Sequence, residues 1–135
     1  MLRVVLDTNV LVSAIISDGK SRELLKKGIT NQYSILISEA ILKELIAVLR
    51  RLKFKISEVE AQRTILAVIR TADVVNVKTK LKAVKEDPKD DMIIETAFDG
   101  GVDIIVTGDS HLLAFEIFKG IKETTVEKML QGRVK

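Results

Sequence analysis

The 135-residue sequence contains no cysteine and one histidine, His111. The absence of cysteine excludes a disulfide scaffold, a thiolate zinc site, an iron–sulfur cluster and a cysteine nucleophile. A single histidine also excludes a metal site that takes several histidines from one chain. Carboxylates are therefore the main candidates for metal ligands in this sequence.

Long apolar segments are missing as well. No apolar run approaches the ~18–20 residues that a membrane span requires. The apolar N-terminus resembles a signal peptide, but Asp7 and Asn9 interrupt it and no small-residue cleavage site follows. We therefore expect a buried strand and then a helix in this segment, no contact with a membrane, and a cytoplasmic protein.

Proline and aromatic residues are scarce, with one proline, Pro88, and 4% aromatic residues. So few aromatic side chains argue against extensive base stacking on single-stranded nucleic acid. The sequence is nevertheless 47% hydrophobic and 30% charged, which excludes intrinsic disorder. No linker or repeat divides the chain, so we expect a single domain over residues 1–135. The net charge of +3 is only weak evidence for a nucleic-acid partner.

Short apolar segments alternate with helical patterns along the chain, and this alternation predicts an α/β fold. Strands are expected at 2–6, 34–37, 74–77, 103–106 and, as a short fifth strand, 122–125. Helices are expected at 10–17, 21–28, 38–52, 57–71, 87–98, 110–118 and 126–131. This order predicts a parallel sheet of four to five strands that is covered on both faces, with ligands bound beyond the carboxyl ends of the strands.

Two aspartates lie where this rule places the chemistry. Asp7 ends the first predicted strand, and Asp109 follows the fourth. Either one alone is explained as well by a capping or turn role. Two of them, on strands that are potential neighbours, favour a shared site.

The segment EDPKDDMIIETAF contains three further aspartates, which helical geometry separates. At about 100° per residue, Asp90 falls near the centre of the apolar face that Ile93, Ile94, Ala97 and Phe98 define. An aspartate on the core side of a helix is costly unless it is paired or bound to a metal, so Asp90 is the functional candidate. Asp87 is explained as an N-cap. Asp91 is explained as a solvated residue of the first turn, and it replaces Asp90 if the helix phase is shifted.

The predicted helix 38–52 carries two glutamates. Glu39 follows the Ser38 cap, where a carboxylate complements the helix dipole, and this structural role is favoured for it. Glu44 lies at the edge of the apolar stripe that contains Ile41 and Leu45. A glutamate at such a boundary is usually solvated, but it is also a candidate for the same site.

A meeting of Asp7, Glu44, Asp90 and Asp109 needs compensation. Two unit charges about 4 Å apart repel by about 4 kcal/mol at an effective dielectric constant near 20. Either some of the carboxyl groups are protonated, or a divalent cation lies among them. Oxygen ligands favour Mg²⁺ or Mn²⁺, ions that suit phosphoryl chemistry.

Three blocks of the sequence carry a family resemblance: VVLDTNVLVSAI, SEAILKELIAVL and DPKDDMIIETAFDGGVDIIVTGDSHLL. In their order and spacing they resemble the PIN-domain family, which includes VapC-type toxins of toxin–antitoxin pairs and other metal-dependent ribonucleases. The resemblance spans nearly the whole chain. It implies a three-layer α/β/α sandwich, often dimeric, that binds Mg²⁺ or Mn²⁺ and hydrolyses RNA phosphodiester bonds. An antitoxin protein and a homodimer or higher oligomer are the partners it implies.

The resemblance also assigns roles to individual positions. Asp7, Glu44, Asp90 and Asp109 match the family's acidic residues. Asp7, Asp90 and Asp109 are expected to hold the metal, and Glu44 to hold a second ion or orient the attacking water. Thr8, Asn9 and Thr107 match polar positions that help orient the cluster. The doubled Asp90-Asp91 leaves the third ligand open between these two residues.

Other functions remain as alternatives. A haloacid-dehalogenase-type phosphohydrolase is disfavoured, because that family has an aspartate where Asn9 stands. A receiver-like or protein-interaction module that binds Mg²⁺ without catalysis would not need Glu44. A subunit of an RNA-processing complex is a third alternative. Basic runs at 50–55 and 78–89 are explained as solvated surface or as a rim that grips phosphates, and His111 as a surface residue or a substrate contact.

Overall fold

The computed structural model describes residues 1–52, 57–78, 88–108, 117–118 and 120–132, with the backbone alone described at 88–91 and 117–118. Its helices are α1 (Thr8–Ile16), α2 (Lys20–Ile29), α3 (Glu39–Arg51), α4 (Glu58–Thr71), α5 (Pro88–Asp99) and α7 (Val126–Leu130). Its strands are β1 (Arg3–Leu6), β2 (Ser34–Ser38), β3 (Asp73–Val75), β4 (Ile104–Val106), β5 (Ile117–Phe118) and β6 (Ile121–Thr124).

The strands form one sheet in the order β3-β2-β1-β4-β6-β5. All neighbours from β3 to β6 are parallel, and only β5 runs antiparallel, against β6. The five parallel strands confirm the predicted α/β fold and its sheet of four to five strands. The helix expected over 110–118 is wrong at its end, because residues 117–118 form β5, and 109–116 lie outside the described residues.

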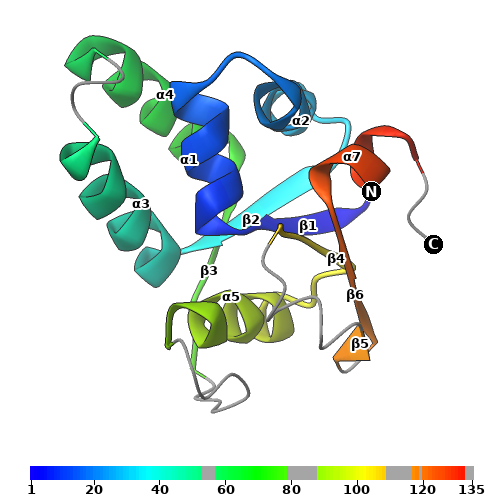
Figure 1. Ribbon diagram of the computed structural model, residues 1–135. Helices are drawn as coiled ribbons and strands as arrows, with labels where there is room; N and C mark the ends of the chain where they lie inside the picture. Colours follow the sequence, from blue (N-terminus) through cyan, green and yellow to red (C-terminus); the bar gives the residue numbers. More distant parts are fainter. Residues whose placement is uncertain (53–56, 79–87, 109–116, 119, 133–135) are drawn as a thin grey trace.

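Helices cover both faces of the sheet, so the fold has three layers (Figure 1). Helix α2 packs closely against one face, where a Cβ on Gly28 would lie 2.2 Å from Ile35 Cδ1. Helix α5 packs against the other face, where a Cβ on Gly100 would lie 2.9 Å from Leu36 Cδ2. Glycine at these two positions lets the helix backbones approach the strands.

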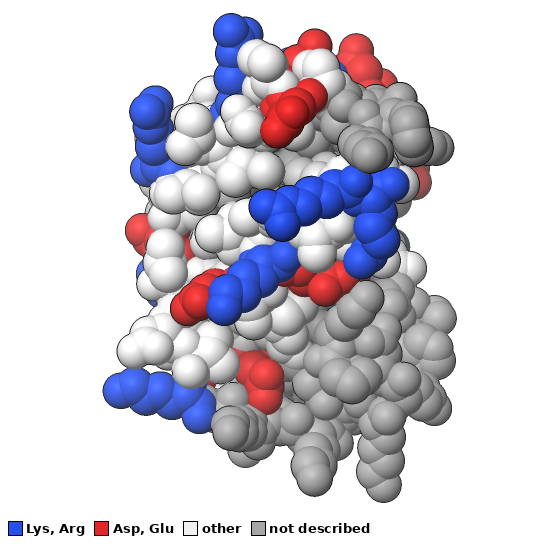
Figure 2. Space-filling model, turned by 90° about the vertical axis from the view of Figure 1, so that its left-hand side faces the viewer, with Lys and Arg blue, Asp and Glu red and all other residues white. Residues whose placement is uncertain are grey.

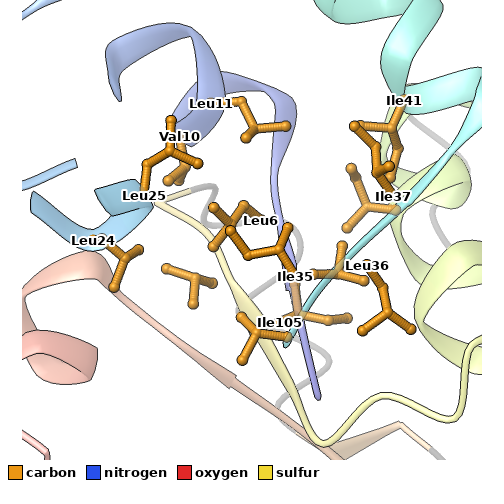
Figure 3. Close-up of a cluster of buried hydrophobic side chains, with 14 of the residues drawn as sticks. Leu6, Val10, Leu11, Leu24, Leu25, Ile35, Leu36, Ile37, Ile41 and Ile105 are labelled. Atoms are coloured by element: carbon orange, nitrogen blue, oxygen red, sulfur yellow. The ribbon is translucent and has the colours of Figure 1, made fainter. Parts of the chain in front are cut away.

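The core consists of the apolar strand residues and the inner faces of the helices. Val4, Ile105 and Leu45 are fully buried. Figure 3 shows Leu6 and Ile35 of the strands beside Leu24 and Leu25 of α2. Burial on both faces explains why β1, β2 and β4 are continuous apolar runs without alternating polar residues.

Capping residues set several helix boundaries as the sequence predicts. The Ser38 and Ser57 hydroxyls accept hydrogen bonds from the backbone N–H groups of Ile41 and Glu60. Pro88 is the first residue of α5, where its fixed φ and missing N–H cost nothing. The chain leaves α5 through Gly101, whose φ of +61° suits glycine.

The predicted inner face of α5 needs one correction. Ile93, Ile94 and Ala97 are buried as expected, but Phe98 is 38% exposed. Phe98 lies in the last turn, one residue before the end of α5, and outside its buried face. Among the described residues, no helix is long and apolar enough to span a bilayer.

Tyr33 provides a first testable prediction, on pH dependence. Its side chain is buried, its hydroxyl donates to the Leu24 carbonyl, and burial raises the pKa of Tyr33 from 10.0 to about 12. The folded protein therefore keeps a proton that the unfolded chain releases. The stability that this proton contributes is complete below pH 10 and is lost as the pH rises from 10 to 12.

The measurement is direct because the sequence has one tyrosine and no tryptophan. The near-ultraviolet absorbance of the phenolate should titrate near pH 12 in the folded protein and near pH 10 in urea. Tyr33→Phe should remove the part of the alkaline loss of stability that comes from the phenol. The part that comes from deprotonation of the lysines should remain. Titration of the folded protein at the ordinary tyrosine pKa would contradict this account.

Candidate functional site

Asp7 lies at the carboxyl end of β1, the strand between β2 and β4 in the sheet. Its backbone N–H donates to the Val106 carbonyl at 3.0 Å, which continues the pairing with β4 by one residue. Its carbonyl accepts from Leu11 and opens α1. The residue is 5% exposed, so the chain holds a carboxylate in the interior at the point where a parallel sheet binds ligands.

Donors from two described residues orient the Asp7 carboxylate. The Thr107 hydroxyl donates to Oδ2 at 2.6 Å, and the Asn9 backbone N–H donates to Oδ1 at 3.2 Å. Thr107 is fully buried, and its own N–H donates to the Thr124 carbonyl at 2.8 Å. The bond from Asn9 makes Asp7 the N-cap of α1. The capping role and a ligand role are therefore compatible, because a carboxylate has lone pairs left for a cation.

Thr8, the first residue of α1, has a buried hydroxyl that meets no hydrogen-bond partner among the described residues. A buried hydroxyl without a partner costs about 1–3 kcal/mol. It follows Asp7 in the chain, at the carboxyl end of β1. A hydroxyl oxygen in this position is suited to a hard cation or to water bound to one.

Glu44 projects from α3, which starts directly after β2. The pairing of Val5 with Leu36 makes Ser38, at the end of β2, level with Asp7. The Glu44 side chain is 20% exposed, at the edge of a stripe in which Ile41 and Leu45 are buried. Its Oε1 lies 3.8 Å from an Arg51 guanidinium nitrogen two turns further along α3. The boundary position predicted for Glu44 is thus observed.

Glu39 takes the structural role that the sequence favours. Its side chain is 78% exposed and forms an ion pair with Lys43 at 2.9 Å. The hydrogen bond and the charge of Lys43 hold the pKa of Glu39 below its ordinary value. An exposed pair of this kind contributes little to stability, and Glu39 does not belong to the candidate site.

Helix α5 directs its N-terminus toward the same edge. The Arg3 guanidinium donates to the Gly100 carbonyl at 2.6 and 3.2 Å, which ties the end of α5 to the start of β1. The helix consequently runs antiparallel to β1, and its first turn is the end that points toward the level of Asp7. Asp90 and Asp91 are in that first turn.

Other predicted residues lie outside the part of the chain that can be placed. Asp109 and His111 are not among the described residues. Within the residues whose side chains are described, no three acidic or histidine side chains gather closely enough to bind a metal ion. Of the candidates that are described, hydrogen bonds join Asp7, Asn9 and Thr107, whereas Thr8 follows Asp7 in α1 and Glu44 lies on α3.

Basic side chains lie near this edge. Figure 2 views the molecule from the side of α3 and α4, toward which β2 points in Figure 1, and shows Lys and Arg side chains crossing the middle of that face beside acidic ones. Arg50 is exposed, and the Arg51 side chain is 63% exposed. This face therefore carries charges of both signs.

A separate groove of about 370 Å³ lies between α1, α2 and α4. Its lining combines apolar side chains such as Ile15 and Leu25 with three basic residues and one acidic residue: Arg22, Lys26, Arg63 and Glu60. The Arg22 guanidinium donates to the Ala14 and Ile15 carbonyls at 3.0 and 2.8 Å, so it also closes the end of α1. None of the candidate site residues whose side chains are described lines this groove.

Comparison with known sequences identifies the family. The family profile described as "PIN domain" matches residues 3–111, a range that includes Asp7, Glu44, Asp90 and Asp109. The chain belongs to the PIN-domain family. The three blocks on which the sequence resemblance rests lie almost entirely within the matched range. No curated protein matches the sequence as a relative.

Solved structures show the PIN fold in related arrangements. PAE2754 from Pyrobaculum aerophilum superimposes with a TM-score of 0.68 at 19% identity, over 98% of this chain and 89% of that one. VapBC2 from Rickettsia felis, solved with a promoter DNA fragment, gives 0.64 at 17% identity, over 92% and 98%. Mycobacterium tuberculosis VapC20, a sarcin–ricin loop cleaving toxin, gives 0.59 at 15% identity, over 88% and 98%. At these identities the likeness establishes the fold.

One polar contact next to the site is not anticipated from the sequence. The Ser38 and Thr96 hydroxyls, both buried, lie 2.7 Å apart and join β2 to α5. The sequence feature that could indicate this contact is the position of Thr96 between Ile94 and Ala97, on the apolar side of its helix. Ser38 was predicted only as a helix cap, because nothing in the local pattern indicates which distant hydroxyl it meets.

Proposed function

We propose that this PIN-domain chain is a metal-dependent ribonuclease and the toxin of a toxin–antitoxin pair. The observation that carries the proposal is the buried Asp7 carboxylate at the carboxyl end of a central strand, held by Thr107 and Asn9. A carboxylate in this position is costly unless a cation or a set of donors compensates it. Family membership supports nuclease chemistry for the compensated site.

The residues present fit Mg²⁺ or Mn²⁺. The donors at the strand ends are carboxylate and hydroxyl oxygens, and the Thr8 hydroxyl lacks a partner among the described residues. Asp7, with Asp90 or Asp91 and with Asp109, would hold the ion. The bound ion supplies neutralisation of phosphate charge and a lower pKa for a bound water.

The side chains of this chain would divide the remaining work. Thr107 and Asn9 keep both Asp7 oxygens at fixed directions, so the carboxylate needs no reorganisation when a ligand arrives. Glu44, at the boundary between core and solvent, would hold a second ion or orient the attacking water. Arg51, beside Glu44, offers a guanidinium to a substrate phosphate. Single-stranded or structured RNA is the proposed substrate.

A cleavage assay with defined metals tests this function. Purified protein should cut single-stranded RNA in Mn²⁺ or Mg²⁺, leave it intact in EDTA, and produce 5′-phosphate and 3′-hydroxyl ends. Ends with a 2′,3′-cyclic phosphate, or cleavage that persists in EDTA, would contradict the proposal. Binding of Mn²⁺ with no cleavage of any RNA would favour the alternative of a non-catalytic module.

We also propose that the protein binds an antitoxin. The groove between α1, α2 and α4 supports this, because its apolar lining carries three basic side chains against the single carboxylate of Glu60 among the described residues. Such a lining suits an amphipathic segment that carries acidic side chains. The homodimer stays a prediction, and it is supported by three exposed apolar side chains on α4: Val59, Leu66 and Ile69. A cytoplasmic location is proposed with the same function.

A further inference from the structure

The hydroxyls of Ser38 and Thr96 form a polar link inside the core. Ser38 is 2% exposed and Thr96 is not exposed at all. Ile93, Ile94 and Ala97, which surround Thr96 in the sequence, are equally buried. A hydroxyl in such surroundings stabilises the fold only when its hydrogen bonds are complete.

Proton counting gives the direction of each bond. The Thr96 hydroxyl lies 2.8 Å from the Met92 carbonyl, which accepts only, so Thr96 donates its single proton there. The proton between Ser38 and Thr96 must then come from Ser38, across 2.7 Å. Ser38 Oγ in turn accepts from the Ile41 N–H at 3.3 Å. The chain of bonds runs from α3 through Ser38 and Thr96 into α5, and every proton is used once.

Glu44 and Asp90 lie at equal sequence distances from this link, each on its own helix. Glu44 lies six residues after Ser38 on α3, and Asp90 lies six residues before Thr96 on α5. The backbone of each of these two residues therefore lies at the end of a helical arm of about 9 Å that starts at the link. A rotation of one helix by about 10° around the link would move the end of such an arm by about 1.5 Å.

We infer that Ser38 and Thr96 are positioning residues that fix the α3 arm with Glu44 against the α5 arm with Asp90. The inference rests on the proposed function, since only a site shared by the two helices gains from a fixed angle between them. A displacement of about 1 Å at a catalytic group costs on the order of a hundredfold in rate. The bonded hydroxyl pair fixes direction as well as distance, which apolar contacts alone leave adjustable.

The test compares Thr96→Val, which keeps the shape and loses the hydroxyl, with Thr96→Ser, which keeps the hydroxyl. Tyr33→Phe is the matched control, because it also removes a buried, hydrogen-bonded hydroxyl but lies on the amino-terminal side of β2, away from the site. The expected result for Thr96→Val is a Mn²⁺ affinity lowered about 10–100-fold and a reduced kcat with little change in KM for RNA. Thr96→Ser and Tyr33→Phe should keep both values near those of the wild type.

A second measurement reports the angle between the helices without metal or RNA. Because the sequence has no cysteine, Arg50→Cys on α3 and Phe98→Cys on α5 introduce two unique sites for spin labels. The distribution of distances between the labels should broaden or shift in Thr96→Val and return in Thr96→Ser. If Thr96→Val does not fold, Thr96→Ala, which also removes the hydroxyl and leaves the Ser38 cap of α3 in place, should give the same changes.

The outcomes distinguish failure of the positioning role from failure of the proposed function. Unchanged label distances and Mn²⁺ affinity in Thr96→Val, with a loss of stability equal to that of Tyr33→Phe, would overturn the positioning role. A wild-type protein that binds Mn²⁺ but cleaves no RNA would instead overturn the proposed function. In that case the Mn²⁺ affinities and label distances still decide whether the link positions the two arms.

Discussion

Replacing Asp7 by asparagine should lower Mn²⁺-dependent cleavage of single-stranded RNA by at least about a hundredfold while the protein stays folded. The carboxylate is buried, and Thr107 and Asn9 already hold its two oxygens in place. Asparagine has nearly the same shape and is an equally good N-cap, so the start of α1 should survive. It lacks the negative charge that binds a cation. The loss should therefore appear in metal affinity and rate, with only a small change in the unfolding midpoint.

The control for this variant is Asp18→Asn, which makes the same chemical change on an exposed residue between α1 and α2. It should leave cleavage and Mn²⁺ binding unchanged. Full cleavage by a folded Asp7→Asn protein would place the activity at another site or in a contaminant. Circular dichroism and thermal unfolding of both variants distinguish loss of function from loss of fold.

The parts of the fold that the sequence predicts best are those with local causes. Ser38 and Ser57 cap helices through bonds to residues three positions away, and Pro88 begins α5 because its ring suits a first helical residue. Residues 117–118 show the opposite case. Their helical pattern is overridden by antiparallel pairing with β6, which joins Ile117 to Lys122. Here the strand conformation depends on pairing with a neighbouring strand, which the local sequence pattern does not reveal.

The candidate site shows the same contrast between features with local causes and features with distant ones. The positions of Asp7 and Glu44 follow from a strand end and from the edge of an apolar helical stripe, so both are predicted from local sequence. The hydrogen bond from Thr107 to Asp7 spans 100 residues, and that between Ser38 and Thr96 spans 58. Contacts of this range depend on which strands are neighbours. Family resemblance marked Thr107 as a polar partner, while only the fold reveals Thr96.

The second large effect is expected at Thr107, which donates to Asp7 Oδ2 at 2.6 Å. Thr107→Val keeps the volume of the side chain and removes this donor, so one Asp7 oxygen loses the bond that fixes its direction. Loss of a hydrogen bond that orients a metal ligand typically costs 10–100-fold in metal affinity or activity. We expect a decrease of that size in Mn²⁺ affinity, with a loss of about 1–3 kcal/mol in the free energy of unfolding.

Thr107→Ser separates the hydroxyl from the methyl group, because it keeps the donor and loses only one carbon. It should bind Mn²⁺ nearly as tightly as the wild type, although its core packing is poorer. Thr71→Val, which removes a hydroxyl that bonds the Ala67 carbonyl at the end of α4, controls for the general effect of this substitution. Equal Mn²⁺ affinities for Thr107→Val and Thr71→Val would show that Asp7 keeps its direction without Thr107. The fixed orientation of the Asp7 carboxylate, on which the proposed function depends, would then need another explanation.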